Sequence, residues 1–423
     1  MKRFRVLLLA DHCNPDWPSL PIVAYKAAKA LSDVADVTLV TQVRNKPAID
    51  RDGAGNAQVV FLDTERVARP MWRLATFLRG GDEGAWTTSM AMAYLPYLEF
   101  ERLAWKTFKT RLSAKEFDVV HRLTPMSPTL PSFLASHSPV PFVLGPLNGG
   151  LKWPREFVAE LRREREWLTY LRNIYRVLPY ARSTYSHAAA ILAAFPHTVA
   201  DMPEVAQART IDLAEVGIDP ELFHSDDGPR PGPTTFLFVG RLVPYKCADV
   251  AIEAFVGSDA LRGCRMRIVG DGPELASLVE IVARYQATDR VEFLGRKKQD
   301  EVGRIMREAH IFTFPSIREL GAGVVVEAMA CGLCCLVVDY GGPGGLINDT
   351  RGVKVPLAEK NMLVLEMRKQ MEQLAKDQER VATLAAEGRR YVLAEYSWAA
   401  KAAKTLEVYR WVTGQRSDKP VFG

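Results

Sequence analysis

Long hydrophobic runs are missing from this chain of 423 residues. No stretch reaches the ~18 consecutive apolar residues that a membrane-spanning helix needs. The N-terminal run MKRFRVLLLADHC is interrupted at Asp11 and His12 and has no small-residue cleavage site, so we expect a buried first strand rather than a signal peptide. These absences exclude a spanning helix but leave attachment to a membrane surface open.

The chain also has little excess charge of either sign and few cysteines in closely spaced pairs. The net charge of +5 comes without a basic tail or a nucleic-acid motif, so we expect no nucleic-acid partner. The six cysteines lie mostly in apolar patterns typical of reduced, buried thiols, which favours a cytoplasmic location. Cys331 and Cys334 have the spacing of half a zinc site, but no second pair and no nearby histidines complete it. We therefore predict no metal at these cysteines.

Apolar runs alternate with helical stretches in both halves of the chain. The runs are FRVLLLA, DVTLVT, QVVFLD, FDVVH and PFVLG in the first half, and TTFLFVG, CRMRIVG, RVEFLG, HIFTFP and CCLVVDY in the second. Strands separated by helices imply βαβ units with parallel sheets. The fold class is therefore α/β, with two similar domains that meet at the Gly-, Pro- and Asp-rich stretch 215–233.

The stretch RELGAGVVVEAMACG is the most informative one in the sequence. Glu319 is expected to end a strand and Glu327 to begin a helix, with a glycine-rich bend between them. A helix that begins near Gly323 directs free N–H groups toward a phosphate. The two carboxylates can accept hydrogen bonds from sugar hydroxyls. The simpler alternative is a solvated loop glutamate and a helix-stabilising one.

Two cations follow the strand FLFVG. Arg241 offers a planar fork and Lys246 a mobile point charge, and together they suit a diphosphate. Taken alone, this spacing is also typical of a solvated loop.

The turn Gly270-Asp271-Gly272-Pro273 resembles the start of a dinucleotide fingerprint, but its third glycine is replaced by Leu275. We therefore interpret this turn as the lining of a mononucleotide base pocket. The residues at the end of RVEFLG, namely Gly295, Arg296 and Lys297, are expected to face the same base.

Together, GRLVPYK, VGDGPE, RVEFLGR and ELGAGVVVEAMACG resemble the nucleotide-sugar domain of glycosyltransferase family 4, within the glycosyl transferases group 1, over roughly residues 236–357. The resemblance implies a GT-B fold, in which two Rossmann-like domains face each other across a cleft. It also implies retention of anomeric configuration, no dedicated metal and no cofactor other than the nucleoside-diphosphate sugar, which is a substrate.

The resemblance assigns roles to individual residues. It implies that Arg241 and Lys246 grip the donor diphosphate, that Glu319 contacts the transferred sugar, and that Glu327 holds the ribose hydroxyls. The catalytic group is then Arg241, Lys246 and Glu319. The full set of predicted donor-binding residues is Gly240, Arg241, Lys246, Gly270, Gly272, Arg296, Lys297, Glu319, Gly321, Ala322, Gly323, Val324 and Glu327.

The Gly-, Pro- and Asp-rich stretch sets the domain limits, and the resemblance implies the role of each domain. Residues 1–215 are expected to form an acceptor domain, and residues 216–395 a donor domain. The C-terminal helix 396–414 is expected to cross back onto the first domain, as in GT-B enzymes.

Some positions depart from the family's commoner pattern. Cys247 and Ala322 stand where glycine is usual, and Leu147 where many members have a histidine that contacts the donor sugar. The stretch CNPDWPSLP replaces a Gly-Gly loop near the donor phosphates, which makes close backbone approach harder. The acceptor-side candidates are Ser19 as the cap of the first helix, His121 after a strand, and Asn148 and Gly149 in the loop after PFVLG.

The tract from Trp153 to Arg182 mixes arginines with tryptophans and tyrosines. It could bind an anionic acceptor or a membrane surface. Interleaved glutamates favour the alternative of a salt-bridged surface helix.

Together with these residues, the family resemblance implies a retaining transfer of a hexose from a nucleoside-diphosphate sugar to the hydroxyl of a sugar or lipid-linked acceptor. Polysaccharide or glycolipid assembly is the expected setting, in the cytoplasm or at the inner face of the membrane. The alternatives are a nucleotide-sugar 2-epimerase and a non-catalytic nucleotide-sugar-binding subunit.

Overall fold

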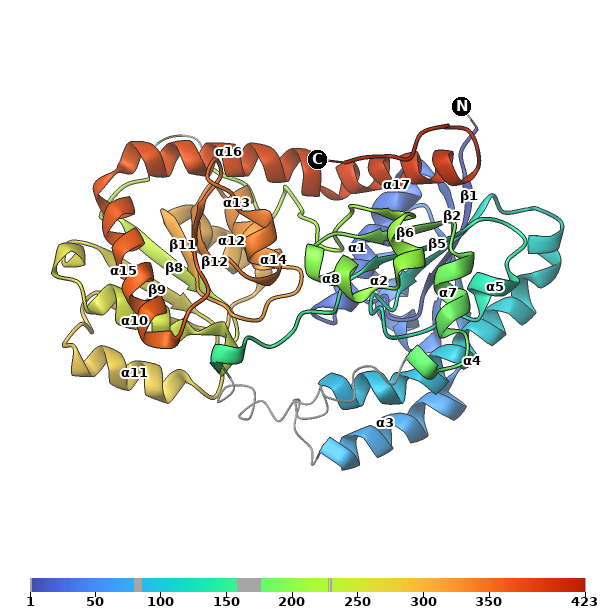
Figure 1. The fold of residues 1–423 in the computed structure, drawn as a ribbon, viewed down its shortest axis with the longest axis horizontal. Helices are drawn as coiled ribbons and strands as arrows, with labels where there is room; N and C mark the ends of the chain where they lie inside the picture. The colour runs from blue at the N-terminus through green and yellow to red at the C-terminus, as the bar shows by residue number, and fades with distance from the viewer. Residues whose placement is uncertain (1, 80–85, 158–175, 227, 229, 423) are drawn as a thin grey trace. The chain divides into compact units, whose positions relative to one another are not determined.

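The computed structural model describes residues 2–79, 86–157, 176–226, 228 and 230–422, which form two compact units (Figure 1). Unit 1 consists of the described parts of Met1–Gly150, Glu164–Gly217 and Trp398–Gly423. Unit 2 consists of those of Leu151–Arg163 and Ile218–Ser397. Each unit is a parallel sheet flanked by helices, so the predicted α/β class is confirmed.

Unit 1 is built on a sheet that has seven strands in the described residues, in the order β3-β2-β1-β4-β5-β6-β7. The strands are β1 (Arg5–Ala10), β2 (Asp36–Gln42), β3 (Gln58–Leu62), β4 (Val119–Thr124), β5 (Phe142–Leu147), β6 (Ala190–Ala193) and β7 (Thr210–Ile211). All neighbouring pairs are parallel. The carboxyl ends of these strands therefore share one edge of the sheet.

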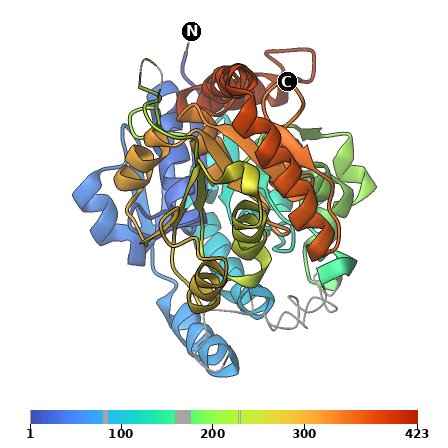
Figure 2. The ribbon, with the colours of Figure 1, turned by 90° about the vertical axis from the view of Figure 1, so that its left-hand side faces the viewer.

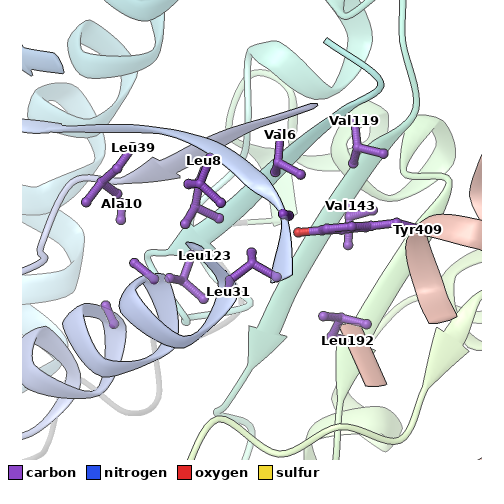
Figure 3. Close-up of a cluster of buried hydrophobic side chains, with 14 of the residues drawn as sticks. Val6, Leu8, Ala10, Leu31, Leu39, Val119, Leu123, Val143, Leu192 and Tyr409 are labelled. Atoms are coloured by element: carbon purple, nitrogen blue, oxygen red, sulfur yellow. The ribbon is translucent and has the colours of Figure 1, made fainter. Parts of the chain in front are cut away.

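The apolar run of β1 is buried on both sides. Side chains alternate along a strand, so Val6 and Leu8 join one buried cluster while Leu7 and Leu9 join another. Figure 3 shows the first cluster, in which Tyr409 from near the C-terminus packs among valines and leucines of the sheet. A parallel sheet covered on both faces accounts for strands that are almost wholly apolar.

Helices cover the sheet of unit 1, and the last of them comes from the C-terminal end of the chain. They are α1 (Leu20–Val34), α2 (Lys46–Asp52), α3 (Glu65–Arg79), α4 (Trp86–Ser113), α5 (Leu134–His137), α7 (Ala181–His187), α8 (Pro196–Asp201), α9 (Glu204–Gln207) and α17 (Trp398–Val412). Helix α17 packs against α1 and places Tyr409 in the core.

Unit 2 has a six-stranded parallel sheet, in the order β10-β9-β8-β11-β12-β13 across its described residues. Its strands are β8 (Thr235–Val239), β9 (Arg265–Val269), β10 (Val291–Gly295), β11 (Ile311–Phe314), β12 (Cys334–Val338) and β13 (Val353–Val355). Its helices are α10 (Ala248–Val256), α11 (Leu275–Arg284), α12 (Gln299–Glu308), α13 (Gly323–Ala330), α14 (Gly341–Leu346), α15 (Lys360–Lys376) and α16 (Gln378–Tyr396).

Helices pack on unit 2 in two groups. Helix α10 contacts α11 and α15, and α13 contacts α16. The colours of Figure 2 let the reader follow the helices of this unit along the chain. Burial of the apolar strands between helices is the arrangement expected of a doubly wound sheet. It leaves the loops at the carboxyl ends of the strands to carry polar side chains.

Candidate functional site

The strand order of unit 2 has a switch point between β8 and β11. From β8 the chain moves outward to β9 and β10, then returns to place β11 on the other side of β8. The loops after β8 and β11 consequently lead away in opposite directions, and ligands of open α/β sheets bind at such a point. Lys246 lies in the loop after β8, and Glu319 lies in the loop after β11.

Lys246 and Glu319 contact each other at this switch point. The Nζ atom of Lys246 donates to Oε2 of Glu319 in an ion pair. The Lys246 side chain is 13% exposed and that of Glu319 is 21% exposed. Lys246 Nζ also lies 4.9 Å from the ring centroid of Phe314, at the end of β11. The structure therefore joins two of the three predicted catalytic side chains, each with part of its surface open to solvent.

Arg241, the third predicted catalytic residue, is exposed at the start of the loop after β8. Nearby glycines explain how that loop is held. A Cβ atom on Gly270 would lie 1.8 Å from the carbonyl oxygen of Gly240, and one on Gly272 would lie 2.4 Å from that of Leu242. Both glycines have positive φ. Their structural role is thus close backbone packing beneath Arg241, while their contact with a base stays a prediction.

The glycine-rich bend opens a helix, as predicted, but the two glutamates lie differently from the expectation. Strand β11 ends at Phe314, so Glu319 lies in the following loop rather than at the strand end. Helix α13 begins at Gly323, which places Glu327 in its second turn rather than at its first residue. Ala322, directly before α13, has φ 54° and is buried. Gly321 and Val324 flank this turn, and their contact with a donor stays a prediction.

Cys247 shares this backbone feature with Ala322. It precedes α10 with φ 51°, also in the left-handed region. The family's usual glycine at both positions has a physical reason, because glycine adopts this conformation without a steric cost. This chain keeps the same two turns with larger residues.

The residues predicted after β10 lie further along the edge. Gly295 ends β10, which is two strands away from β8 in the sheet. Arg296 is exposed, and Lys297 Nζ is 3.9 Å from Glu301 Oε1. Their contact with a nucleotide base stays a prediction.

A short segment from the first half of the sequence packs on the loops of unit 2. The ring of Trp153 meets that of Tyr245 edge-on, with centroids 6.3 Å apart. The guanidinium carbon of Arg318 lies 4.9 Å from the Trp153 centroid. In the same segment, the carbonyl of Lys152 accepts a hydrogen bond of 2.6 Å from the Tyr340 hydroxyl. Trp153 thus touches the neighbours of both Lys246 and Glu319, a role that sequence analysis missed.

The candidates in unit 1 have local partners. His121 lies inside β4 rather than after a strand, and it is 2% exposed. Its ring nitrogens are 2.6 Å from the Tyr409 hydroxyl and 2.6 Å from the Gly145 carbonyl oxygen. Burial lowers the pKa of His121 to about 4, so it is neutral in the core. This geometry corrects the expectation of a histidine that faces a ligand.

The remaining acceptor-side candidates are held by the fold. Ser19 precedes α1 as expected, but its side chain makes no capping hydrogen bond. The amide nitrogen of the Asn148 side chain donates to Oε1 of Glu215. The backbone nitrogen of Gly149 donates to the Thr198 hydroxyl over 3.3 Å. Their contact with an acceptor stays a prediction.

The arginine-rich tract and the predicted membrane contact concern other parts of the chain. Most of the arginine-rich tract falls on residues 158–175, which lie outside the described residues. In the described part of the chain, no helix is long and apolar enough to cross a membrane.

The sequence also contains the spacing Asp50-x-Asp52, which metal-binding transferases use. Here Asp50 pairs with Lys46 and Asp52 with Arg51, in exposed ion pairs of 2.7 Å on α2.

Residues 221–391 match the family model described as glycosyl transferases group 1. A D-inositol 3-phosphate glycosyltransferase of Rhodococcus opacus is 29% identical over 229 residues, which cover 49% of this chain and 49% of that protein. A 2-deoxystreptamine glucosyltransferase of Streptomyces kanamyceticus is 28% identical over 219 residues, which cover 49% of this chain and 56% of that protein. The chain spans about half the length of the curated relatives it matches.

Solved structures resemble the chain over nearly its whole length. HepE of Anabaena, in complex with UDP, has a TM-score of 0.64 at 15% identity, with 96% of this chain and 99% of that one covered. Sucrose-phosphate synthase of Thermosynechococcus elongatus has a TM-score of 0.65 at 18% identity, with 98% and 100% covered. These likenesses confirm the predicted fold, GT-B with two Rossmann-like units.

Proposed function

We propose that this chain, whose residues 221–391 match the glycosyl transferases group 1 family, moves a hexose from a nucleoside-diphosphate sugar to an acceptor hydroxyl with retention of configuration. The observation that carries the proposal is the contact between Lys246 and Glu319 at the switch point of unit 2. A cation for phosphate and a carboxylate for sugar hydroxyls are adjacent there, where such sheets bind ligands.

The chemistry asks the protein mainly to stabilise charge. The bond from the anomeric carbon to the diphosphate breaks as the acceptor oxygen forms its bond on the same face, and the departing phosphate takes the acceptor proton. Negative charge grows on that phosphate, where Arg241, Lys246 and the start of α13 would stabilise it. Losing one such group typically lowers the rate by ~100- to 1000-fold. Glu319 would orient the sugar through its hydroxyls, without a metal ion.

The donor and the setting are parts of the same proposal. The fold is shared with HepE, whose structures are described with UDP and with UDP-glucose, and this likeness supports a nucleotide-sugar donor. The matched relatives are named for different acceptors, an inositol phosphate and 2-deoxystreptamine. We propose a sugar or lipid-linked acceptor in polysaccharide or glycolipid assembly, at the cytoplasmic face of a membrane.

The test begins with thermal-shift measurements on nucleoside diphosphates and their sugars, followed by a transfer assay with the best donor. Lys246→Ala should lose both the nucleotide-induced shift and almost all transfer. Lys298→Ala is the matched control, because Lys298 is exposed on the same unit after β10. Full transfer by Lys246→Ala would disprove the diphosphate assignment.

The same assay separates the two alternatives. A 2-epimerase would release a sugar altered at C2 without any acceptor. A non-catalytic binding subunit would show the thermal shift but leave the donor intact. Slow donor hydrolysis without acceptor, with retained configuration in the released sugar, is the outcome that the proposal expects.

A further inference from the structure

Unit 1 has a switch point of its own, between β1 and β4. The chain places β2 and β3 on one side of β1, then returns to place β4 on the other side. Asp11 and His12 follow β1 directly, and Thr124 ends β4. Polar side chains thus gather in unit 1 at the position where Lys246 and Glu319 lie in unit 2, the position that favours a ligand in both sheets.

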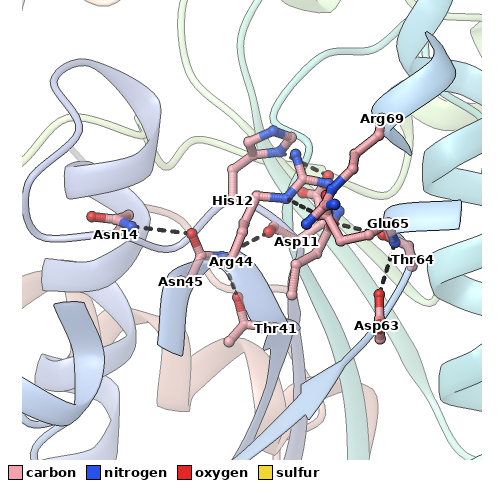
Figure 4. Close-up of polar contacts among 11 residues, drawn as sticks. Asp11, His12, Asn14, Thr41, Arg44, Asn45, Asp63, Thr64, Glu65 and Arg69 are labelled. Carbon is pink, nitrogen blue, oxygen red and sulfur yellow. Dashed lines mark hydrogen bonds and ion pairs between the residues drawn. The ribbon is translucent and has the colours of Figure 1, made fainter. Parts of the chain in front are cut away.

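Asp11 and His12 form a pair that the surrounding strands hold in place (Figure 4). The Nδ1 atom of His12 lies 2.8 Å from Oδ2 of Asp11. The Thr124 hydroxyl donates to Oδ1 of Asp11 over 2.8 Å. The Asn45 side-chain amide donates to the backbone carbonyl of Asp11 over 3.0 Å. The backbone nitrogen of His12 is 3.3 Å from the Thr124 hydroxyl oxygen. Asn45 therefore holds the backbone of Asp11, while Thr124 fixes its carboxylate and, through it, the imidazole of His12.

The two members of this pair differ in exposure. The Asp11 side chain is 4% exposed, whereas that of His12 is 43% exposed. A carboxylate bonded to Nδ1 fixes the tautomer of a neutral histidine, with the proton on Nδ1 and a lone pair on Nε2. The contrast with His121 is clear, because both ring nitrogens of His121 have partners within the core.

Asp11, Arg44 and partial burial each influence the pKa of His12. The charge of Asp11 raises the pKa of His12, while burial and the charge of Arg44 oppose that rise. Arg44 in turn pairs with Glu65 over 3.2 Å, and Glu65 also pairs with Arg69 over 2.9 Å. Burial by itself would raise the pKa of Asp11, but His12 and the hydrogen bonds outweigh it and keep the carboxyl ionised.

We propose that His12 is the acceptor-binding residue of unit 1, and that its Nε2 atom accepts a hydrogen bond from a hydroxyl of a polyhydroxylated acceptor. The inference rests on the proposed transfer reaction and adds the acceptor side to it. Asp11 is the positioning residue, since it holds the imidazole in the required tautomer. His12 takes no proton in this scheme, because the acceptor proton leaves with the donor phosphate.

The experiment compares wild type, His12→Ala, His12→Gln and Asp11→Asn with the identified donor. Octyl glycosides of glucose, galactose, mannose and N-acetylglucosamine serve as acceptor probes, and donor hydrolysis by water is the baseline. His12→Ala should lower kcat/KM for the accepted glycoside about 10- to 100-fold, while donor KM and hydrolysis change less than about 2-fold. His187→Ala, which alters an exposed histidine of α7, should behave as wild type.

The pH profile separates ligand binding from a structural role. Protonated His12 has no lone pair on Nε2, so transfer should fall as the pH drops through its pKa. Asp11→Asn removes the charge that raises this pKa, and the acidic limb should therefore move to lower pH. A purely structural pair would leave the position of the limb unchanged. His12→Gln, which keeps a polar group near Nε2, should retain more transfer than His12→Ala.

Several outcomes would overturn the inference. One is wild-type kcat/KM for the glycoside in a folded His12→Ala variant, and another is an equal loss of transfer and donor hydrolysis. A third is a wild type that hydrolyses the donor but neither glycosylates any of the four probes nor shifts its His12 proton resonance with them. In each case donor binding and donor hydrolysis by the wild type would still support the proposed function. The proposed function itself would fail if the wild type neither bound nor hydrolysed any donor.

Discussion

Lys246, in the loop after β8, and Glu319, in the loop after β11, are ion-pair partners. Phosphate oxygens and the Glu319 carboxylate would compete for the same ammonium group, because both are anionic hydrogen-bond acceptors. Donor binding therefore has to weaken the Lys246–Glu319 ion pair, or the ammonium group has to bind the carboxylate and a phosphate oxygen at the same time. The pair also keeps a half-buried cation compensated until the diphosphate arrives.

The first prediction follows from that competition. Glu319→Gln should bind the free nucleoside diphosphate about 2- to 5-fold more tightly, since an ion pair of this kind is worth up to ~1 kcal/mol. Transfer should nevertheless fall at least ~10-fold, because a sugar contact is lost. Isothermal titration with the diphosphate and a transfer assay measure the two effects. Weaker diphosphate binding by Glu319→Gln would contradict the proposed competition.

Trp153 provides the second prediction. It contacts Tyr245 and Arg318, the residues that directly precede Lys246 and Glu319. Trp153→Ala removes a cation–π contact of ~0.5–2 kcal/mol and should raise the donor KM several-fold. Trp153→Phe keeps an aromatic ring and should have a donor KM between those of Trp153→Ala and the wild type. Steady-state kinetics with the donor varied would measure this. Trp72→Ala, at a tryptophan that is 64% exposed on unit 1, is the control.

Local patterns were sufficient to predict the fold class and the helix that begins after the glycine-rich bend. FRVLLLA had to be a buried strand, because nearly all its side chains are apolar, and the structure buries both faces of β1. The glycine-rich bend before Val324 predicted a helix start, and α13 begins there at Gly323. These features depend on residues close in sequence, where period and turn chemistry are informative.

Local sequence patterns do not predict contacts between residues that are far apart in the sequence. In the sequence, Asp11 only marks the end of a hydrophobic run. Its hydrogen-bond donor Thr124 is 113 positions away, so no local pattern connects the two residues. His121 was misplaced by a small shift in the expected end of β4, and such boundaries are the least reliable part of a sequence reading. Only the sheet order shows that Asp11 and Thr124 meet at a switch point.

Ala322 gives the third prediction, on stability. Its φ of 54° costs an L-residue roughly 1–2 kcal/mol, which glycine avoids. Ala322→Gly also deletes a buried methyl, so the matched control is Ala328→Gly, which deletes one inside α13. We expect Ala322→Gly to be more stable than Ala328→Gly by at least ~1 kcal/mol in chemical unfolding. Equal stabilities would show that the turn before α13 carries no backbone strain.

Lys401 gives the last prediction, which concerns pH. It is 7% exposed in α17, where its Nζ donates to the carbonyl of Ala214, and it lines a cavity of about 40 Å³ together with Glu215 and Trp398. Burial lowers its pKa to about 7, from 10.5 in an exposed lysine. Between those values the unfolded chain holds a proton that the folded chain lacks. The free energy of unfolding should therefore rise with pH across that window.

Lys401→Met tests this sign, because the variant has a side chain of similar length that does not titrate. In the wild type, Lys401 should raise the free energy of unfolding by up to about 2 kcal/mol between pH 7.0 and 8.5. In Lys401→Met this increase should be absent. The window stops at pH 8.5 because burial also raises the pKa of cysteines such as Cys334 to about 12, an effect that opposes the gain at higher pH. Lys109→Met, at an exposed lysine of α4, should keep the wild-type slope in thermal unfolding. A slope unchanged in Lys401→Met would mean that Lys401 stays charged in the folded protein, with water in the cavity to solvate it.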